Sequence, residues 1–357
     1  MAKVHVIGAG PAGSIAAISA IRSGHSVHVS EEHSVSGIPE NCSGLFSKDG
    51  LESLAGFFDY RKFIVRPILG ADIYLMDQKL SVRKKEPIGF VCDRSGIDLA
   101  LSQKAESAGA KIAYGQRVNE DFKSENIIGA DGPLSSVASR FQFPRIQRFA
   151  STLQAVLRYK SEDPDAVEVF LSNSRFPGFF GWVIPKDEES AEFGVGVELP
   201  HRAADAWASL LKMKRMAEAP KPKGALIPLA IRQKTAMRKG KMNILLAGDS
   251  AGQVKATTGG GVIFGGNCAA LAGKYVGDPL RYELEWRTRF SPDLSIHSAL
   301  HSYLAGLSDA ELSLLGRRLK RLDLDGYLSA HGHMDKPTKM LGPGLLAHII
   351  RNFIGFG

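Results

Sequence analysis

The sequence is poor in cysteine and lacks long apolar runs. Its three cysteines, Cys42, Cys92 and Cys268, cannot build a disulfide framework, and none belongs to a CxxC pair, which argues against a zinc site or a dithiol relay. This usage fits a reducing cytoplasm. No stretch of about 18 or more uncharged apolar residues occurs, so we expect no membrane-spanning helix. A strand-like run follows the first residues directly, so we expect no signal peptide.

Acidic residues are scarce in one part of the chain. The formal net charge is +8, and the stretch from Lys212 to Lys241 holds ten Lys/Arg residues and a single acid, Glu218. This stretch has no recognisable nucleic-acid-binding module and no interleaved aromatic residues, so we expect no nucleic acid partner. It fits an anionic membrane surface, an acidic partner protein or a plain solvated face.

The composition is otherwise that of a globular protein, with 44% hydrophobic and 23% charged residues. The length of 357 residues suggests about two domains. Glycine is plentiful, at 38 residues, and many of the glycines fall in clusters. Such clusters indicate places where the backbone closely approaches a ligand.

The first cluster has the order strand, glycine turn, helix, strand, acid. These parts are Lys3–Ile7, the GAGPAG of Gly8–Gly13, Ser14–Ser23, Ser26–Ser30 and Glu31. In such a GxGxxG turn Gly8 permits the tight bend, Gly10 lets the backbone approach a pyrophosphate, and Gly13 allows close packing of helix on strand. The helix N-terminus faces the phosphate charge, and Glu31 can accept hydrogen bonds from a ribose. We therefore predict a dinucleotide-binding unit.

Two further apolar strands end in a glycine and an aspartate, which favours FAD as the dinucleotide. They read IIGADG at Ile127–Gly132 and ILLAGDSAG at Ile244–Gly252. An aspartate just past a strand can meet a sugar or ribityl hydroxyl. The TTGGG that follows opens a predicted helix, Val262–Leu271, and its glycines would present bare backbone N–H groups to a ring or a phosphate.

Together with FVCDRSGID at Phe90–Asp98 and ENCSGL around Cys42, these motifs resemble the geranylgeranyl reductase family, which sits within the para-hydroxybenzoate hydroxylase-like flavoproteins. The resemblance extends from residue 1 to about residue 290. It implies an α/β fold with a Rossmann-type FAD-binding domain, an inserted β-sheet substrate domain and a helical C-terminal region. It also implies FAD contacts at Ala12, Glu31, Cys42, Ser43, Gly44, Arg94, Val118, Asp249, Gly261 and Val262, beside the glycines of the first turn.

Two of the polar residues in these motifs have a second interpretation. The guanidinium of Arg94 can pair with a pyrophosphate, but Asp98 stands at i+4 and could hold Arg94 in a surface ion pair. Asp131, in IIGADG, could be purely structural and support the turn into the next helix.

Aromatic residues crowd the window 176–185, which reads FPGFFGWVIP. Aromatic rings favour a core strand. The family pattern PxxYxWxFP is matched here by Pro177, Phe180, Trp182, Ile184 and Pro185, with Phe180 at the usual tyrosine and Ile184 at the usual phenylalanine. Alternation places Phe180, Trp182 and Ile184 on one strand face. We expect this face to line a slot for an isoprenoid chain, where each buried CH₂ contributes roughly 0.8 kcal/mol.

The expected reaction is carried by the flavin, because no nucleophile triad, HExxH motif or paired carboxylates are visible. An isolated C=C bond accepts hydride only if a proton is delivered as the hydride arrives. Aromatic faces can stabilise the positive charge that develops, and a dry pocket protects it. Cys42 is the candidate catalytic residue, placed by the resemblance near the flavin ring, where it could position the ring or relay a proton. The alternative is a small buried thiol.

We expect a discontinuous FAD-binding domain at 1–64, 86–145 and 235–285, a substrate domain at 65–85 and 146–234, and a helical region at 286–357. Candidate strands in the substrate domain are Ala150–Tyr159, Ala166–Leu171, Phe179–Ile184 and Glu192–Val197, and residues 199–219 read as an amphipathic helix. The end, Leu341–Gly357, could lie in a membrane interface or cap the substrate domain. His331 and His333 lack a visible partner cluster, so we expect no metal site.

The sequence therefore predicts an FAD-dependent reductase that saturates isolated C=C bonds of a geranylgeranyl or related isoprenoid lipid. NAD(P)H or a ferredoxin would supply the electrons, and the basic stretch could dock the latter. We expect a cytoplasmic protein that can touch the inner membrane face. Alternatives are a flavin-dependent monooxygenase or halogenase of the same fold, and a non-catalytic electron-transfer flavoprotein. A halogenase would carry a further tryptophan at position 180 and a lysine near 82–85, and Phe180 argues against it.

Overall fold

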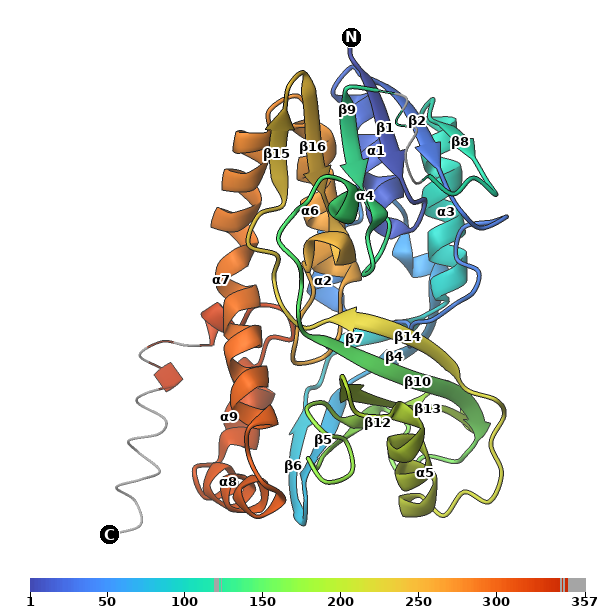
Figure 1. The fold of residues 1–357 in the computed structure, drawn as a ribbon. Helices are drawn as coiled ribbons and strands as arrows, with labels where there is room; N and C mark the ends of the chain where they lie inside the picture. The colour runs from blue at the N-terminus through green and yellow to red at the C-terminus, as the bar shows by residue number, and fades with distance from the viewer. Residues whose placement is uncertain (119–121, 123, 341, 343, 346–357) are drawn as a thin grey trace.

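The computed structural model describes residues 1–118, 122, 124–340, 342 and 344–345 of the chain. Two large sheets lie one above the other in Figure 1, and a long C-terminal helix, α7, runs beside both. The expected segment Leu341–Gly357 falls almost entirely outside the described residues.

The upper sheet has six strands in the order β15-β16-β9-β1-β2-β8. Their bounds are Ala236–Lys239, Met242–Leu246, Asn126–Gly129, Lys3–Ile7, Ser26–Ser30 and Lys111–Ala113. All neighbours are parallel except the edge pair β15–β16. The central strands are buried and rich in Val and Ile, as expected when helices cover a parallel sheet.

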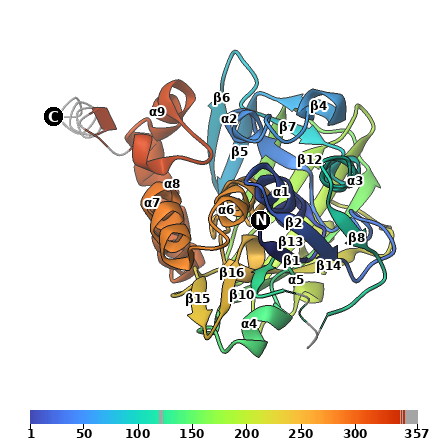
Figure 2. The ribbon, with the colours of Figure 1, turned by 90° about the horizontal axis from the view of Figure 1, so that it is seen from above.

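Three helices pack together beside the upper sheet: α1 (Pro11–Arg22), α3 (Arg94–Ser107) and α6 (Val262–Lys274). Figure 2 shows α6 between α1 and α7. Small residues let α1 and α6 approach closely, since a β-carbon on Gly273 would lie 2.2 Å from the carbonyl oxygen of Ala16. A short helix, α4 (Ser136–Arg140), follows β9.

The lower sheet has seven strands in the order β14-β10-β13-β12-β11-β5-β6. Their bounds are Lys223–Pro228, Phe149–Arg158, Ser190–Glu198, Gly181–Pro185, Ala166–Leu171, Gly70–Leu75 and Gln78–Arg83. Only β11 and β5 run parallel. One face of this sheet packs against α5 (Ala203–Met213) through Phe193, Val195 and Val197. The other face packs against Val91 and Ala256, which come from the upper half of the molecule.

A small sheet joins the two halves. Its strands are β3 (Leu45–Ser47), β7 (Gly89–Cys92) and β4 (Ile64–Ile68), in that order. Helix α2 (Lys48–Ser53) and the 3₁₀ turns η1 (Tyr60–Phe63) and η2 (Gly248–Ala251) complete this region.

The C-terminal region is helical, as predicted. It consists of α7 (Pro279–Ala305), α8 (Asp309–Arg321), α9 (Leu324–His331) and the turn η3 (Pro337–Lys339). A reciprocal capping box between Ser308 and Glu311 begins α8, which packs on β5 and β6. Within the described residues, none of the helices combines the length and the apolar character that crossing a membrane requires.

The expected elements agree closely with the observed ones, but the basic stretch does not form one surface. Lys214 lies just past α5 at the bottom of Figure 1, whereas Arg238 lies in β15 at the top. Lys214 is held by Glu168 at 2.7 Å, and the buried Arg232 donates hydrogen bonds to backbone carbonyls. The helix expected at 199–219 spans only Ala203–Met213, because Arg215 takes a positive φ of 55° soon after its end.

Candidate functional site

The turn between β1 and α1 needs glycine at two positions and is open at a third. Gly8 has a φ of 97°, and a β-carbon on it would lie 2.4 Å from the carbonyl oxygen of Ala130. A β-carbon on Gly13 would lie 1.9 Å from the carbonyl oxygen of Gly8. At Gly10, the N-cap of α1, a β-carbon would meet no atom within 4 Å. Pro11 is the first helical residue and has no N–H, and no side chain caps the N–H groups that follow it.

Glu31 lies beside this turn, as expected. Its Oε2 accepts a hydrogen bond of 2.6 Å from the backbone N–H of Ala9, and its Oε1 accepts one of 2.9 Å from that of His33. The side chain is 9% exposed, and these hydrogen bonds fix the carboxylate at the end of β2. An acid held there can receive ribose hydroxyls.

Arg94 forms the ion pair with Asp98, but the pair is partly buried rather than on the open surface: the side chain of Asp98 is 7% exposed and that of Arg94 is 16% exposed. Nε and Nη2 of Arg94 donate to the two carboxylate oxygens of Asp98 at 2.6 and 3.0 Å. Burial by itself would lower the pKa of Arg94, but Asp98 and the neighbouring Cys42 raise it well above its ordinary value. Burial also raises the pKa of Asp249, against the opposing charge of Arg94. Arg94 therefore lies near enough to Cys42 and to Asp249 to interact with each of them.

The loop Cys42–Gly44 packs against β7. Gly44 has a φ of 72°, and a β-carbon on it would lie 2.2 Å from the carbonyl oxygen of Cys92. Cys42 is partly exposed, while Cys92 and Cys268 are buried. Burial raises the pKa of Cys92 to about 12 and that of Cys268 well above its usual range. Cys42 is thus the accessible thiol.

The residues expected after β16 meet the start of α1. A β-carbon on Gly261 would lie 2.6 Å from Oδ1 of Asp249, and one on Gly248 would lie 2.9 Å from Cβ of Ala12. Gly261 is the N-cap of α6 and Val262 its first residue, again with no side-chain cap. Two uncapped helix N-termini, those of α1 and α6, therefore lie on either side of Gly248–Asp249.

Asp131 follows directly on the first turn, since a β-carbon on Gly8 would lie 3.4 Å from its Cα, whereas the side chain of Val118 points away from the cluster. Val118 is buried among residues of the opposite face of the upper sheet, with Ile7 and Ile127. The segment before it stays beside Glu31, since the N–H of Gln116 donates to the Glu31 carbonyl at 2.8 Å.

The side chain of Asp131 has a structural role at the start of α4. It accepts hydrogen bonds from the hydroxyls of Ser135 and Ser136 and from the N–H of Val137. This is the second of the two interpretations offered for Asp131.

The aromatic window divides between two faces of the lower sheet. Phe176 is fully buried on the face that packs on α5. Phe180, Trp182 and Ile184 lie together on the other face, as the alternation predicted. A β-carbon on Gly194, opposite Trp182 in β13, would lie 2.0 Å from the indole ring, so the ring lies flat against the strand. The rings on both faces are buried, as expected of a core strand, and the slot for an isoprenoid chain along Phe180, Trp182 and Ile184 stays a prediction.

The exposed edges of this aromatic face meet both expected flavin loops. Phe179 stacks on Phe180 with ring centroids 4.3 Å apart, and its Cζ would lie 3.5 Å from a β-carbon on Gly259. At the other end, Nζ of Lys186 donates a hydrogen bond of 2.6 Å to the carbonyl oxygen of Ser43. The aromatic face of β12 thus extends from the TTGGG loop to the Cys42 loop.

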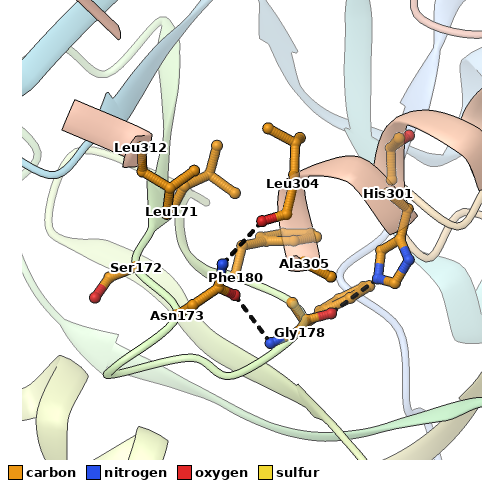
Figure 3. Close-up of a pocket in the computed structure, with 11 residues that line it drawn as sticks. Leu171, Ser172, Asn173, Gly178, Phe180, His301, Leu304, Ala305 and Leu312 are labelled. Carbon is orange, nitrogen blue, oxygen red and sulfur yellow. Dashed lines mark hydrogen bonds between the residues drawn. The ribbon is translucent and has the colours of Figure 1, made fainter. Parts of the chain in front are cut away.

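A cavity continues from the aromatic face toward the end of α7 (Figure 3). His301 bounds it through a hydrogen bond of 2.8 Å between its Nε2 and the Gly178 carbonyl, and Asn173 ties Gly178 to Leu304. The remaining lining is mostly apolar: Leu171, Phe179, Phe180, Leu304, Ala305 and Leu312, with Ser172 and Thr257. Figure 3 shows the three leucines gathered at one side.

Several buried polar groups near the site were not among the residues predicted from the sequence. Glu192 is buried beside Trp182, and Lys255 forms a buried ion pair with Asp335 at 2.5 Å below the TTGGG loop. His297, like His301, is buried on α7. Their i, i+4 spacing was a signal that both face the same way. Glu192 begins the predicted strand Glu192–Val197, but the face to which it points is shown only by its pairing with Ile184 in the sheet register.

The chain is similar to several known proteins. No family model matches it. A digeranylgeranylglycerophospholipid reductase from Methanothrix thermoacetophila is 27% identical over 374 residues, covering 91% of this chain and 94% of that protein. The crystal structure of a geranylgeranyl bacteriochlorophyll reductase-like protein from Thermoplasma acidophilum superimposes with a TM-score of 0.78 at 20% identity, covering 98% and 96% of the two chains.

A flavin-dependent halogenase is more distant, with a TM-score of 0.59, 16% identity and coverage of 100% of this chain and 70% of that one. The resemblance to geranylgeranyl reductases that the sequence indicated is confirmed by these relatives. The expected α/β flavoprotein fold with a helical C-terminal region is confirmed as well. The expected oxidoreductase activity and FAD agree with the names these proteins carry.

Proposed function

We propose that this protein is an FAD-dependent reductase that saturates isolated C=C bonds of a geranylgeranyl-bearing glycerophospholipid. The observation that carries the proposal is the aromatic face of β12, which lies between the two loops expected to hold the flavin ring. A reduced flavin between these loops would face Phe180, Trp182 and Ile184. The names of the relatives support both the cofactor and the lipid.

The residues present fit FAD. Two uncapped helix N-termini supply free N–H groups, and the open position at Gly10 leaves room for a pyrophosphate. We assign the remaining contacts to Gly8, Ala12, Gly13, Glu31, Cys42, Ser43, Gly44, Arg94, Asp249, Gly261 and Val262. At Val118 we assign a contact to the backbone alone, because its side chain is buried in the core on the opposite face of the upper sheet. Asp98 holds the Arg94 fork with two hydrogen bonds, so the guanidinium is oriented in advance. When bound, FAD supplies the hydride for one alkene carbon.

The protein itself would bind the isoprenoid, exclude water from it and stabilise the positive charge that develops on the alkene. Phe180, Trp182 and Ile184 are each less than one-tenth exposed, so an isoprenoid against them is shielded from water. The faces of Phe180 and Trp182 can stabilise positive charge at a substituted alkene carbon. Phe180 has no hydroxyl, so it cannot act as the proton donor.

The cavity at the end of α7 marks the direction in which we propose that the isoprenoid tail extends; at about 20 Å³ it holds only about one water molecule, so its walls must move apart to admit the tail. Its leucines and Phe179 form apolar walls that continue the face of β12. Each methylene buried there contributes roughly 0.8 kcal/mol to binding. The domain boundaries proposed from the sequence place the cavity in the substrate domain and the helical region, apart from Thr257.

The electron donor is a nicotinamide or a ferredoxin. The basic stretch 212–241 is divided between opposite ends of the molecule, so it does not support a single docking surface for either. We propose a cytoplasmic location with contact at the inner membrane face, because a phospholipid that bears geranylgeranyl chains resides in membranes.

The alternative function is that of a monooxygenase or halogenase. The fold resembles that of a flavin-dependent halogenase, so the experiment must distinguish this alternative from the reductase. Against it, position 180 is a phenylalanine, and Lys84 donates its amine hydrogen bond to the Gly332 carbonyl, in the C-terminal region rather than on the aromatic face.

Product mass separates these functions. The FAD-loaded protein is reduced and incubated anaerobically with a geranylgeranyl glycerophospholipid, and a parallel sample receives oxygen and halide. The reductase predicts a mass gain of two hydrogens per double bond without oxygen. Inserted oxygen or halogen in the second sample would assign the alternative, and unchanged lipid in both would favour an electron-transfer protein.

A further inference from the structure

One carboxylic acid lies on the apolar face that the proposed function assigns to substrate. Glu192 in β13 stands opposite Ile184 of β12 in the sheet register, on the same face as Trp182. It is 4% exposed. The indole Nε1 of Trp182 donates a hydrogen bond of 3.3 Å to its Oε1. Burying a carboxylate among apolar side chains costs folding free energy unless the carboxylate is paired and hydrogen-bonded.

The second carboxylate oxygen of Glu192, Oε2, lies toward the loop that carries Cys42. Nζ of Lys186 lies 3.3 Å from Oε2 of Glu192 and also donates to the Ser43 carbonyl. Lys186 is 18% exposed at its side chain, which gives the pair a route to solvent. The other charged group that influences Glu192 is Glu40. Glu192 therefore lies between the aromatic wall and the loop that carries Cys42.

We propose that Glu192 is the acid that delivers the proton in alkene reduction, a step that rests on the proposed function. The O–H bond of its carboxyl breaks, and a C–H bond forms at one alkene carbon as the π bond opens. The other carbon accepts hydride from the reduced flavin, so the alkene gains two electrons and two hydrogens. The carboxylate left behind is stabilised by Lys186 and the Trp182 N–H, and takes up a proton from solvent before the next turnover.

The surroundings suit this role. Burial raises the pKa of Glu192, whereas Lys186 and the Trp182 hydrogen bond act in the opposite direction. An acid whose pKa lies above the ordinary carboxyl range keeps its proton closer to neutral pH. The lack of a phenol at Phe180 leaves Glu192 as the acidic group of the aromatic face in the described part of the chain.

The test is the substitution Glu192→Gln, with Glu168→Gln as a matched control. Glu168 is also paired with a lysine, Lys214 at 2.7 Å, but in β11 on the opposite face of the same sheet. Gln at 192 keeps an acceptor for Trp182 and removes the proton. We expect at least a hundredfold slower lipid-dependent oxidation of the reduced flavin, because general acids contribute about 10²–10⁴-fold. FAD affinity and chemical reduction of the flavin stay unchanged.

The pH profile provides the readout that a structural role would not move. In the wild type, the rate should fall as pH rises and Glu192 loses its proton. In Glu192→Gln this limb disappears, and Glu192→Asp, a second variant, should retain it at a lower rate. Two results would overturn the inference, provided that the wild type reduces the alkene. Either the Glu192→Gln variant reacts as fast as the wild type, or its rate still falls at high pH as the wild-type rate does. Absence of reduction by the wild type would instead overturn the proposed function.

Discussion

Nζ of Lys186, one residue past β12, donates a hydrogen bond of 2.6 Å to the carbonyl oxygen of Ser43. This bond joins the strand of the aromatic face to the loop that carries Cys42. At the opposite end of the same face, Phe179 meets the TTGGG loop at Gly259. The distance between the aromatic face and the expected flavin position is therefore fixed at both ends.

Removing this lysine should change the pH dependence of the reaction. Lys186 lowers the pKa of Glu192 through its charge and hydrogen bond. In Lys186→Met that pKa should rise further, so Glu192 stays protonated to higher pH and the decline in rate moves to higher pH. The measurement is the pH dependence of single-turnover flavin oxidation by lipid. A decline at unchanged or lower pH would contradict the assignment of Glu192.

Substitutions of two glycines in the first turn should have different effects, one on FAD binding and the other on the stability of the apoprotein. Gly10→Val adds atoms where a β-carbon meets nothing within 4 Å, so the apoprotein should keep its melting temperature but bind FAD at least tenfold more weakly. Gly13→Val places a β-carbon 1.9 Å from the Gly8 carbonyl and should destabilise the apoprotein itself. Thermal melts and FAD titrations measure the two effects. Equal FAD affinity in Gly10→Val and wild type would place the pyrophosphate elsewhere.

Cys42 should be the thiol that reagents reach. It is partly exposed, whereas burial raises the pKa of Cys92 to about 12 and that of Cys268 well above its usual range. Iodoacetamide at neutral pH should therefore label Cys42 and spare the other two, because the thiolate is the reactive form. Added FAD should slow the labelling. Peptide mass mapping with and without FAD measures this, and equal labelling in both samples would remove Cys42 from the flavin site.

The catalytic part of the Cys42 prediction is separate. Cys42→Ala should retain FAD and lower alkene reduction by a large factor, while Cys268→Ala should leave the rate unchanged. Single-turnover rates of both variants decide the matter. Unchanged turnover of Cys42→Ala would reject the catalytic role.

His297 should make stability depend on mildly acidic pH. Burial lowers its pKa from 6.5 to about 4, and its Nδ1 shares a hydrogen bond of 2.6 Å with Thr257. The unfolded state therefore binds this proton more readily than the folded state. The stabilisation is complete above pH 6.5 and is lost as pH falls toward 4.

The loss attributable to His297 at about pH 5 is roughly 2 kcal/mol relative to about pH 7.5. Urea unfolding of the wild type and of His297→Gln at these two values isolates it. The variant should lose about 2 kcal/mol less than the wild type between them. An identical pH dependence of the two proteins would show that His297 titrates normally.

Much of the fold could be predicted from the sequence, because strands and glycine turns are specified by short stretches of neighbouring residues. Strands at Lys3–Ile7, Ser26–Ser30 and Ala166–Leu171 have the predicted bounds, since apolar runs and glycine turns fix them within a few residues. The alternation in β12 also predicted which side chains share a face. The cofactor turn was equally visible, because a positive φ at Gly8 leaves few other residues possible.

The remainder depends on contacts between distant segments. Glu192 lies in a stretch of charged residues, and only pairing of β13 with β12 turns it toward Trp182. The basic stretch 212–241 looked continuous in sequence, but the chain crosses from one sheet to the other within it. The Lys255–Asp335 pair joins segments 80 residues apart, which no local pattern reports.

The most direct test of the whole account is the fate of the reduced flavin in the absence of oxygen. The FAD-loaded protein is reduced, mixed anaerobically with a geranylgeranyl glycerophospholipid, and followed by the return of flavin absorbance. We predict that the lipid alone reoxidises the flavin, because the alkene is the electron acceptor. A flavin that stays reduced with the lipid and reoxidises only when oxygen is admitted would contradict the account.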